Sequence, residues 1–167
     1  NPADNETLIL YYSKMGTTAT VAKKIHSLIP EAELAEIKSD TGIMKAVFWH
    51  QPFSRNAAIE TINAETKKYD RIILCSPIWL QKIASPARTA INTLPLENKQ
   101  LHLFITCGGY FGEGGQKRLK KRVEKNGIRL MSLSILKTGG KSDKEIEDQT
   151  HEAVSAVLPQ LQTASCR

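Results

Sequence analysis

Short apolar runs alternate along this chain with stretches whose apolar residues recur at helical spacing. The first example is LILYYSKMGTTATVAKKI, in which an apolar run ends at a Ser/Gly/Thr turn, and Val21, Ala22 and Ile25 then recur on one helix face. A fully apolar run bounded by a turn is typical of a strand buried on both faces. Comparable runs follow at residues 32–38, 71–76, 100–107 and 128–136. This alternation predicts an α/β fold, a doubly wound sheet of five parallel strands with helices on both faces.

Residues that favour helix boundaries lie between these runs. In SPARTAINTL, Ser85 is the predicted N-cap and Pro86 takes the first helical position. Before the last helix, Ser142 and Glu145 have the spacing of a capping box. Pro159 is expected to kink or end that helix, because proline cannot donate the backbone hydrogen bond.

The turn after the first apolar run, SKMGTT, sets hydroxyls and a glycine at the start of a helix. A helix N-terminus carries unpaired N–H groups and a partial positive charge, so this composition suits a phosphate group. The alternative is an ordinary strand-to-helix turn with Thr17 or Thr18 as N-cap. The turn by itself leaves both interpretations open.

Three elaborate loops follow the first, third and fourth expected strands: SKMGTT, SPIWLQKIAS and CGGYFGEGG. The carboxyl ends of parallel strands meet at one edge of a sheet, and ligands of such sheets bind there, where the strand order reverses. We therefore expect the functional site at this edge.

Several other kinds of site are excluded, because the chain lacks the residues they require at the required positions. TGGKS resembles the end of a P-loop, but Ile135 stands where the first glycine is required. GYFGEGG does not complete the dinucleotide pattern G-x-G-x-x-G, because Lys117 stands at its third glycine. Cys75 and Cys107 have no arginine six places on, as a cysteine phosphatase needs, and both are expected to be buried thiols. The strand ends also lack the acidic residues of a phospho-receiver domain.

Composition sets broader limits. A length of 167 residues suits one domain over residues 1–167, and no apolar run is long enough to span a bilayer. Three cysteines without metal-ligand spacing favour a reducing compartment, so a cytoplasmic protein is expected. The net charge of +6 favours acidic partners, and the basic run QKRLKKRVEK is either a solvated helix face or part of such an interface. With 6% aromatic residues and no groove-binding motif, nucleic-acid binding is not expected.

Three segments of the chain resemble, in their order and spacing, the motifs of flavodoxin-like FMN-binding proteins of the compact single-domain kind. They are YYSKMGTTATVA, CSPIWLQKIASPARTAI and LFITCGGYFGEGG. The first corresponds to the phosphate loop S/T-x-T-G-x-T, the second to the S/T-P-x-W/Y loop beside the flavin ring, and the third to the Gly-rich loop after the fourth strand. The resemblance covers nearly the whole chain. It implies a three-layer fold with a five-stranded parallel sheet in the strand order 2-1-3-4-5, and noncovalent FMN.

The resemblance also implies cofactor-binding residues in each loop. Those of the phosphate loop are Ser13, Lys14, Met15, Gly16, Thr17 and Thr18. Those beside the flavin ring are Ser76, Pro77, Ile78 and Trp79. Those of the Gly-rich loop are Thr106, Cys107, Gly108, Gly109 and Tyr110. Met15 departs from the family pattern, which usually has Thr there, and the Trp79 indole is assigned either to the flavin ring or to packing or a partner contact.

Trp49 and Phe53, which precede a helix expected over residues 56–70, match no motif and are left as either a cover for the flavin or part of the core.

Three classes of function stay open. In proteins of this kind the flavin supplies the chemistry, so no catalytic acid or base and no metal is expected of the chain. The first class is an oxidoreductase that takes hydride from NAD(P)H and reduces a quinone-like small molecule. The second is a flavodoxin-type electron carrier with a redox protein as donor, although flavodoxins are commonly acidic and this chain is basic. The third, raised by Met15, is a flavin-free binding protein that keeps the fold.

Overall fold

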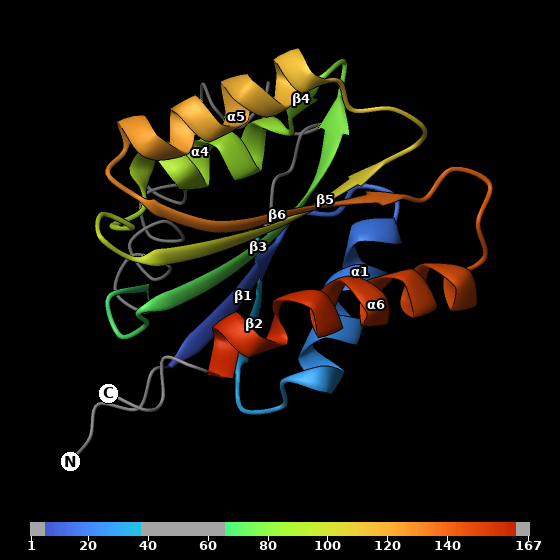
Figure 1. Cartoon of the computed structure of the whole chain (residues 1–167), viewed down its shortest axis with the longest axis horizontal. Helices are drawn as coiled ribbons and strands as arrows, with labels where there is room; N and C mark the ends of the chain where they lie inside the picture. Colours follow the sequence, from blue (N-terminus) through green and yellow to red (C-terminus); the bar gives the residue numbers. More distant parts are fainter. Residues whose placement is uncertain (1–5, 38–65, 163–167) are drawn as a thin grey trace, which may run out of the picture.

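A computed structural model describes residues 6–37 and 66–162 (Figure 1). Its sheet contains five parallel strands in the order β2-β1-β3-β5-β6, with a short strand β4 attached to β3. The parallel strands are β1 (Thr7–Tyr11), β2 (Glu33–Glu36), β3 (Arg71–Trp79), β5 (Gln100–Cys107) and β6 (Arg129–Lys137). Because β4 is a hairpin partner outside the parallel order, the five parallel strands follow the predicted order 2-1-3-4-5.

Helices cover both faces of the sheet (Figure 1). One face carries α1 (Thr17–Leu28) and α6 (Asp143–Gln162), and the other carries α4 (Ser85–Thr93) and α5 (Glu113–Lys125). The predicted three-layer arrangement is confirmed. Trp49, Phe53 and most of the helix expected over residues 56–70 lie outside the described residues.

The two hydrophobic cores explain why strand β1 is apolar without a break from Leu8 to Tyr11. Along β1, Leu8 and Leu10 pack into the core under α4 and α5, whereas Ile9 and Tyr11 pack into the core under α1 and α6. Successive side chains of a strand point to opposite faces, so a strand covered on both faces must be apolar at every position. The continuous run therefore follows from the double cover.

The loop expected after the third strand is a β-hairpin, so this prediction was wrong. Strand β3 continues through Trp79 and pairs antiparallel with β4 (Lys82–Ile83). Leu80 and Gln81 form the two-residue turn, with φ of 50° and 62°. Positive φ at both central residues is the geometry that suits the twist of a tight hairpin. The two residue types gave no sign of this turn, because Asn and Gly are the residues that usually adopt it.

The helix boundaries were predicted with mixed success. The capping box is confirmed, since the Ser142 N–H donates to a Glu145 carboxylate oxygen at 2.8 Å and the Glu145 N–H donates to the Ser142 hydroxyl at 3.3 Å. Ser85 is the first residue of α4 and not its N-cap, because the extended backbone of the hairpin continues only to Ala84. Pro159 lies inside α6, which continues to Gln162.

Candidate functional site

A cavity of about 220 Å³ opens at the carboxyl end of the parallel strands, at the right-hand edge of the sheet in Figure 1. The ends of β1, β3 and β5 and the loop after β6 surround it. Its wall is formed by Ser13, Lys14, Met15, Thr17, Thr18, Pro77, Ile78, Trp79, Thr106, Cys107, Gly108 and Thr138. The structure thus brings the three predicted loops together at the edge where parallel α/β sheets bind ligands.

The first loop presents the start of α1 to the cavity. Gly16 is the N-cap of α1 with φ of 94°, and its N–H donates to the Ser13 hydroxyl at 3.1 Å. No side chain among the described residues caps α1, and its first turn has no acidic residue. The first N–H groups of a helix have no intrahelical acceptor, so this helix start offers unmatched donors and positive potential. The alternative of Thr17 or Thr18 as a side-chain N-cap was wrong.

Two buried hydroxyls meet beside this helix start. The Thr18 and Thr106 Oγ1 atoms are 2.9 Å apart, and the two residues are 2% and 3% exposed. Each hydroxyl can donate one hydrogen bond and accept others, so their mutual bond leaves further capacity toward the cavity. The pair fixes the distance between α1 and the end of β5.

Trp79 forms an aromatic part of the wall. Its ring meets the Tyr12 ring edge-on, with centroids 5.7 Å apart and an interplanar angle of 83°. The Lys14 ammonium lies 5.8 Å from the Trp79 ring centroid, which is a cation–π distance. Trp79 remains 38% exposed, so these contacts orient the indole without covering it. An oriented and half-open aromatic surface suits a planar ligand.

The Gly-rich loop brings bare backbone to the cavity. A Cβ added at Gly108 or Gly109 would meet no atom of the described residues within 4 Å, so these residues leave the space beside the backbone open. Cys107 precedes the loop and is buried, and burial raises the pKa of its thiol. Burial raises the pKa of Cys75 as well. Both thiols are therefore neutral at physiological pH, so neither is prepared as a nucleophile.

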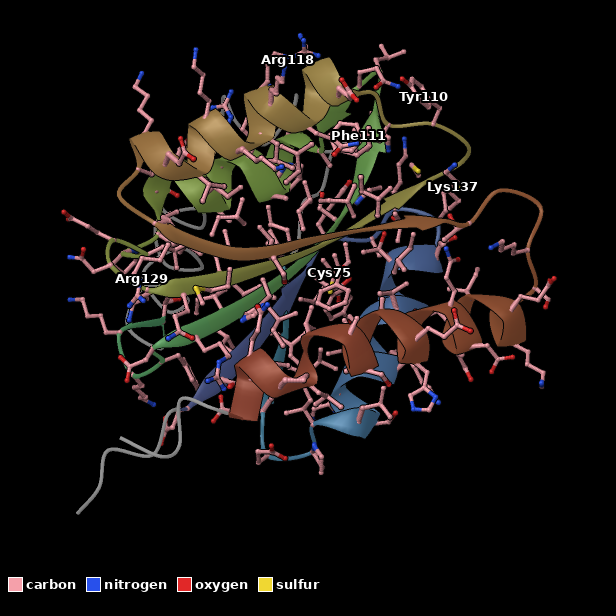
Figure 2. The ribbon with its side chains drawn as sticks, viewed as in Figure 1. Cys75, Tyr110, Phe111, Arg118, Arg129 and Lys137 are labelled. Carbon is pink, nitrogen blue, oxygen red and sulfur yellow. The ribbon has the colours of Figure 1, made fainter. Side chains whose placement is uncertain are left out.

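Gln81 ties the hairpin to the Gly-rich loop. Its side-chain amide donates to the Tyr110 carbonyl oxygen at 2.8 Å and accepts from the Gly112 N–H at 2.6 Å. In Figure 2, Phe111 lies between α5 and the sheet, while Tyr110 stands at the outer edge. The second and third loops are thus fixed to each other through one side chain, and no sequence motif singled out Gln81 for this role.

The loop after β6 also forms part of the cavity wall, and the sequence motifs did not lead us to predict this. Thr138 lines the cavity, and its N–H donates to the Cys107 carbonyl oxygen at 2.8 Å. A Cβ added at Gly139 would lie 1.9 Å from the Gly108 carbonyl oxygen, so the two loops touch through backbone alone. The segment TGGKS could have indicated this loop. It does not match a P-loop, but two adjacent glycines are typical of a place where two backbones approach closely.

Some predicted residues lie near the cavity but not on its wall: Gly16, Ser76, Gly109 and Tyr110. Ser76 is fully buried and its hydroxyl donates to the Pro77 carbonyl oxygen at 3.0 Å. Tyr110 is 72% exposed and its ring lies against Gly112. Gly16 and Gly109 act through backbone position, since each neighbours a residue of the wall.

Residues 6–37 and 66–162 contain no group of three or more His, Cys, Asp and Glu placed to hold a metal ion. None of the helices in these two ranges combines the length and the apolar character that crossing a membrane requires. What the site does offer is a positive helix start, buried hydroxyls, open backbone and an aromatic wall in one cavity. This set suits a ligand with an anionic group at one end and a planar ring at the other.

No model of a protein family matches the sequence, and no curated protein sequence matches it either. Solved structures do match the fold. A flavoprotein from Lactobacillus acidophilus NCFM in complex with FMN is 24% identical, with 88% of this chain and 99% of that chain covered and a TM-score of 0.59. An FMN-dependent NADH-azoreductase from Bacillus anthracis is 13% identical, with 95% and 99% covered and a TM-score of 0.63. The two-electron reduced flavodoxin of Megasphaera elsdenii is 19% identical, with 87% and 98% covered and a TM-score of 0.57. The fold of this chain is flavodoxin-like.

Proposed function

We propose that this protein binds FMN without a covalent bond in the cavity at the carboxyl end of the sheet, and that it transfers electrons through this cofactor. The observation that carries the proposal is the uncapped start of α1, which shares one cavity with the Thr18–Thr106 pair and the half-exposed Trp79. Neighbours of the same fold include an FMN complex and an FMN-dependent reductase. Their identity to this chain is low, so the proposal rests on the residues of this cavity.

The residues of the cavity fit FMN at both of its ends. The N–H groups of the first turn of α1 and the Thr17 and Thr18 hydroxyls would hold the phosphate. Lys14 adds positive charge in the same loop, which offsets the hydroxyl that Met15 lacks. The Trp79 indole and the bare backbone at Gly108 would flank the isoalloxazine ring.

Bound FMN supplies hydride or single-electron chemistry, and the chain sets its potential through stacking, hydrogen bonds and nearby charge. Trp79 would exclude water from one face of the ring and make added negative charge less favourable there. Cys107, held neutral by burial, adds no charge to the wall. Each of these residues binds, orients or tunes, and none moves a proton.

For the electron donor, the proposal keeps two candidates. An NAD(P)H-dependent reductase of a quinone-like acceptor is supported by the azoreductase neighbour, and an electron carrier between proteins by the flavodoxin neighbour. The absorption spectrum of the FMN-loaded protein separates them. Bleaching of the flavin bands by NADH or NADPH alone indicates the reductase, and bleaching only with a reduced redox protein indicates the carrier.

The buried free thiols of Cys75 and Cys107 support a reducing compartment such as the cytoplasm.

The phosphate assignment has its own test, which compares FMN with riboflavin. The change Thr18→Val keeps side-chain volume but removes the hydroxyl. We expect it to weaken FMN by about tenfold, the effect of about one lost charge-assisted hydrogen bond, and to leave riboflavin unchanged. Affinity is measured by quenching of flavin fluorescence on titration of the apoprotein.

Thr20→Val is the matched control, because the Thr20 hydroxyl donates to the Gly16 carbonyl oxygen and does not line the cavity. Equal affinity of the unaltered protein for FMN and riboflavin would show that no phosphate is bound at α1 and would remove the basis of the proposal.

A further inference from the structure

We propose that Leu80 and the basic side chains of α5 beside it form a docking surface for an acidic redox protein. The docking surface is defined by Leu80, Lys117, Arg118 and Lys121. The inference rests on the proposed function, because it names the partner class that would exchange electrons with a cofactor in the adjacent cavity. It goes beyond that function by assigning the partner to particular side chains outside the cavity wall.

Leu80 is the first observation. It occupies a hairpin turn at φ of 50° and is 95% exposed. A bulky residue with positive φ is strained by about 1 kcal/mol or more, and Asn or Gly would adopt the same turn more easily. Leu80 does not line the cavity, and exposed as it is, its side chain adds nothing to the core. A strained, exposed, apolar side chain at a loop tip is explained by contact with a partner.

The hairpin tip is also held in a fixed position. Gln81 makes two side-chain hydrogen bonds to the Gly-rich loop, and the Arg118 Nη2 donates to the Gln81 carbonyl oxygen at 3.4 Å. A surface that is already ordered loses less conformational entropy when a partner binds. The same contact places the guanidinium of Arg118 beside the tip that carries Leu80.

The charge on α5 is the second, independent observation. Lys117, Arg118 and Lys121 are exposed on its outer face, where Figure 2 shows Arg118 pointing away from the sheet. Among the residues that the structure describes, the single ion pair joins Lys144 to Asp148, on α6 across the sheet. Within the described residues, Lys117, Arg118 and Lys121 form no ion pair, although Glu113 and Glu124 lie on the same helix. Basic residues outnumber acidic ones on α5, whereas acidic residues outnumber basic ones on α6, so the excess of positive charge lies on the α5 layer.

An acidic protein fits these features better than an anionic membrane does. Of the four large apolar side chains exposed in the described residues, Met15 and Trp79 line the cavity, whereas Leu80 and Tyr110 do not, and of these two only Leu80 lacks a polar group. Burying one leucine yields roughly 2 kcal/mol, far less than a myristoyl chain, which itself anchors only marginally. One apolar anchor amid charged residues is instead typical of a protein interface.

The test measures binding of a plant-type [2Fe–2S] ferredoxin, an acidic redox protein, by isothermal titration calorimetry at about 50 mM and about 300 mM salt. We expect the double change Lys117→Glu with Lys121→Glu to weaken binding by tenfold or more at low salt. Leu80→Asn suits the turn and should weaken it severalfold at both salt concentrations. The matched control, Lys23→Glu with Lys144→Glu, changes net charge equally on the α1 and α6 layer and should have a much smaller effect.

Every titration is run on the apoprotein and on the FMN-loaded protein, and FMN affinity is recorded for each variant. Loss of FMN binding would concern the proposed function, whereas the apoprotein titrations test the docking surface alone. The docking surface is wrong if ferredoxin does not bind at low salt, or binds all variants equally. It is also wrong if Leu80→Asn instead abolishes cosedimentation with phosphatidylserine vesicles, or abolishes low-salt self-association in sedimentation velocity.

Discussion

The carboxyl and amino ends of the parallel sheet depart from the usual distribution of polar and apolar side chains in opposite ways. At the carboxyl end the described chain exposes its large apolar side chains: Met15, Trp79, Leu80 and Tyr110. At the amino end it buries two basic ones, Arg71 and His102. In Figure 2, Lys137 and Arg129 mark these two ends of β6.

The buried polar residues of the amino end are only partly satisfied. The Arg71 Nη1 donates to the Thr7 hydroxyl at 3.3 Å, and its Nε has no hydrogen-bond partner among the described residues. The His102 Nδ1 lies 2.8 Å from the Ser132 Oγ, and no group in residues 6–37 or 66–162 bonds to its Nε2. Burial, aided by the charge of Arg71, lowers the pKa of His102 to about 4. This end is packed at an electrostatic cost, whereas the carboxyl end leaves apolar surface and bare backbone open, as a binding site does.

The largest expected effect tests how tightly the carboxyl end is built. Gly139→Ala sets a methyl group 1.9 Å from the Gly108 carbonyl oxygen, so one of two backbones must move. We expect a loss of more than about 3 kcal/mol in the free energy of unfolding, together with loss of FMN affinity. Urea denaturation and the FMN titration measure these two quantities.

Gly140→Ala is the control for this change. Gly140 has φ of 71° but open space around its Cβ position, so only backbone strain of about 1 kcal/mol is expected. If both variants lose the same stability, steric contact with Gly108 does not decide the shape of the cavity.

A smaller effect tests the amino end through pH. The native pKa of His102 is about 4 and its ordinary value is 6.5, so between these values the unfolded chain binds a proton that the native chain does not. The stability that His102 confers as a neutral group is present above pH 6.5 and is lost as pH falls toward 4. We expect wild type to lose roughly 2 kcal/mol more than His102→Asn between pH 7 and pH 4.5.

Denaturant unfolding at a series of pH values measures this difference, and His151→Asn, an exposed histidine on α6, is the control. Parallel pH profiles for wild type and His102→Asn would mean that the amino end does not keep this imidazole neutral.

The smallest effect concerns the side chain that joins two loops at the carboxyl end. Gln81→Ala removes the hydrogen bonds to the Tyr110 carbonyl oxygen and the Gly112 N–H, at an expected cost of about 1–2 kcal/mol. Hydrogen exchange at the Gly112 amide should accelerate, because its acceptor is gone. Gln116→Ala, which loses one bond to the Phe111 carbonyl oxygen, serves as comparison. A slower or unchanged Gly112 amide in Gln81→Ala would contradict this role.

Local patterns in the sequence predicted much of the fold. The two-sided burial of β1 follows from its unbroken apolar run, and the start of α6 follows from the three-residue spacing of Ser142 and Glu145. These features depend on residues close together in the chain, so the periodicity and hydrogen-bonding capacity of a short segment are enough to predict them. The strand order came from resemblance to a known fold, which three motifs in register supported.

The candidate site was predicted less completely. The three loops were located because each follows a strand, and parallel topology brings strand ends together. The hairpin turn at Leu80 and Gln81 was missed, because neither residue type favours positive φ. Thr138 was missed because its motif was judged only as a P-loop, although its place after β6 puts it at the same edge.

By itself, then, the sequence determined the alternation of elements, the double cover of the sheet and the composition of each loop. Tertiary structure alone decided which groups meet: the Thr18 and Thr106 hydroxyls, 88 positions apart, and the Gln81 amide and Gly112 N–H, 31 positions apart. Contacts of this kind depend on strand order and register, and a register shift of one residue would turn each side chain to the other face of the sheet. Periodicity fixes which face a residue occupies, but only the packed sheet fixes its neighbours across that face.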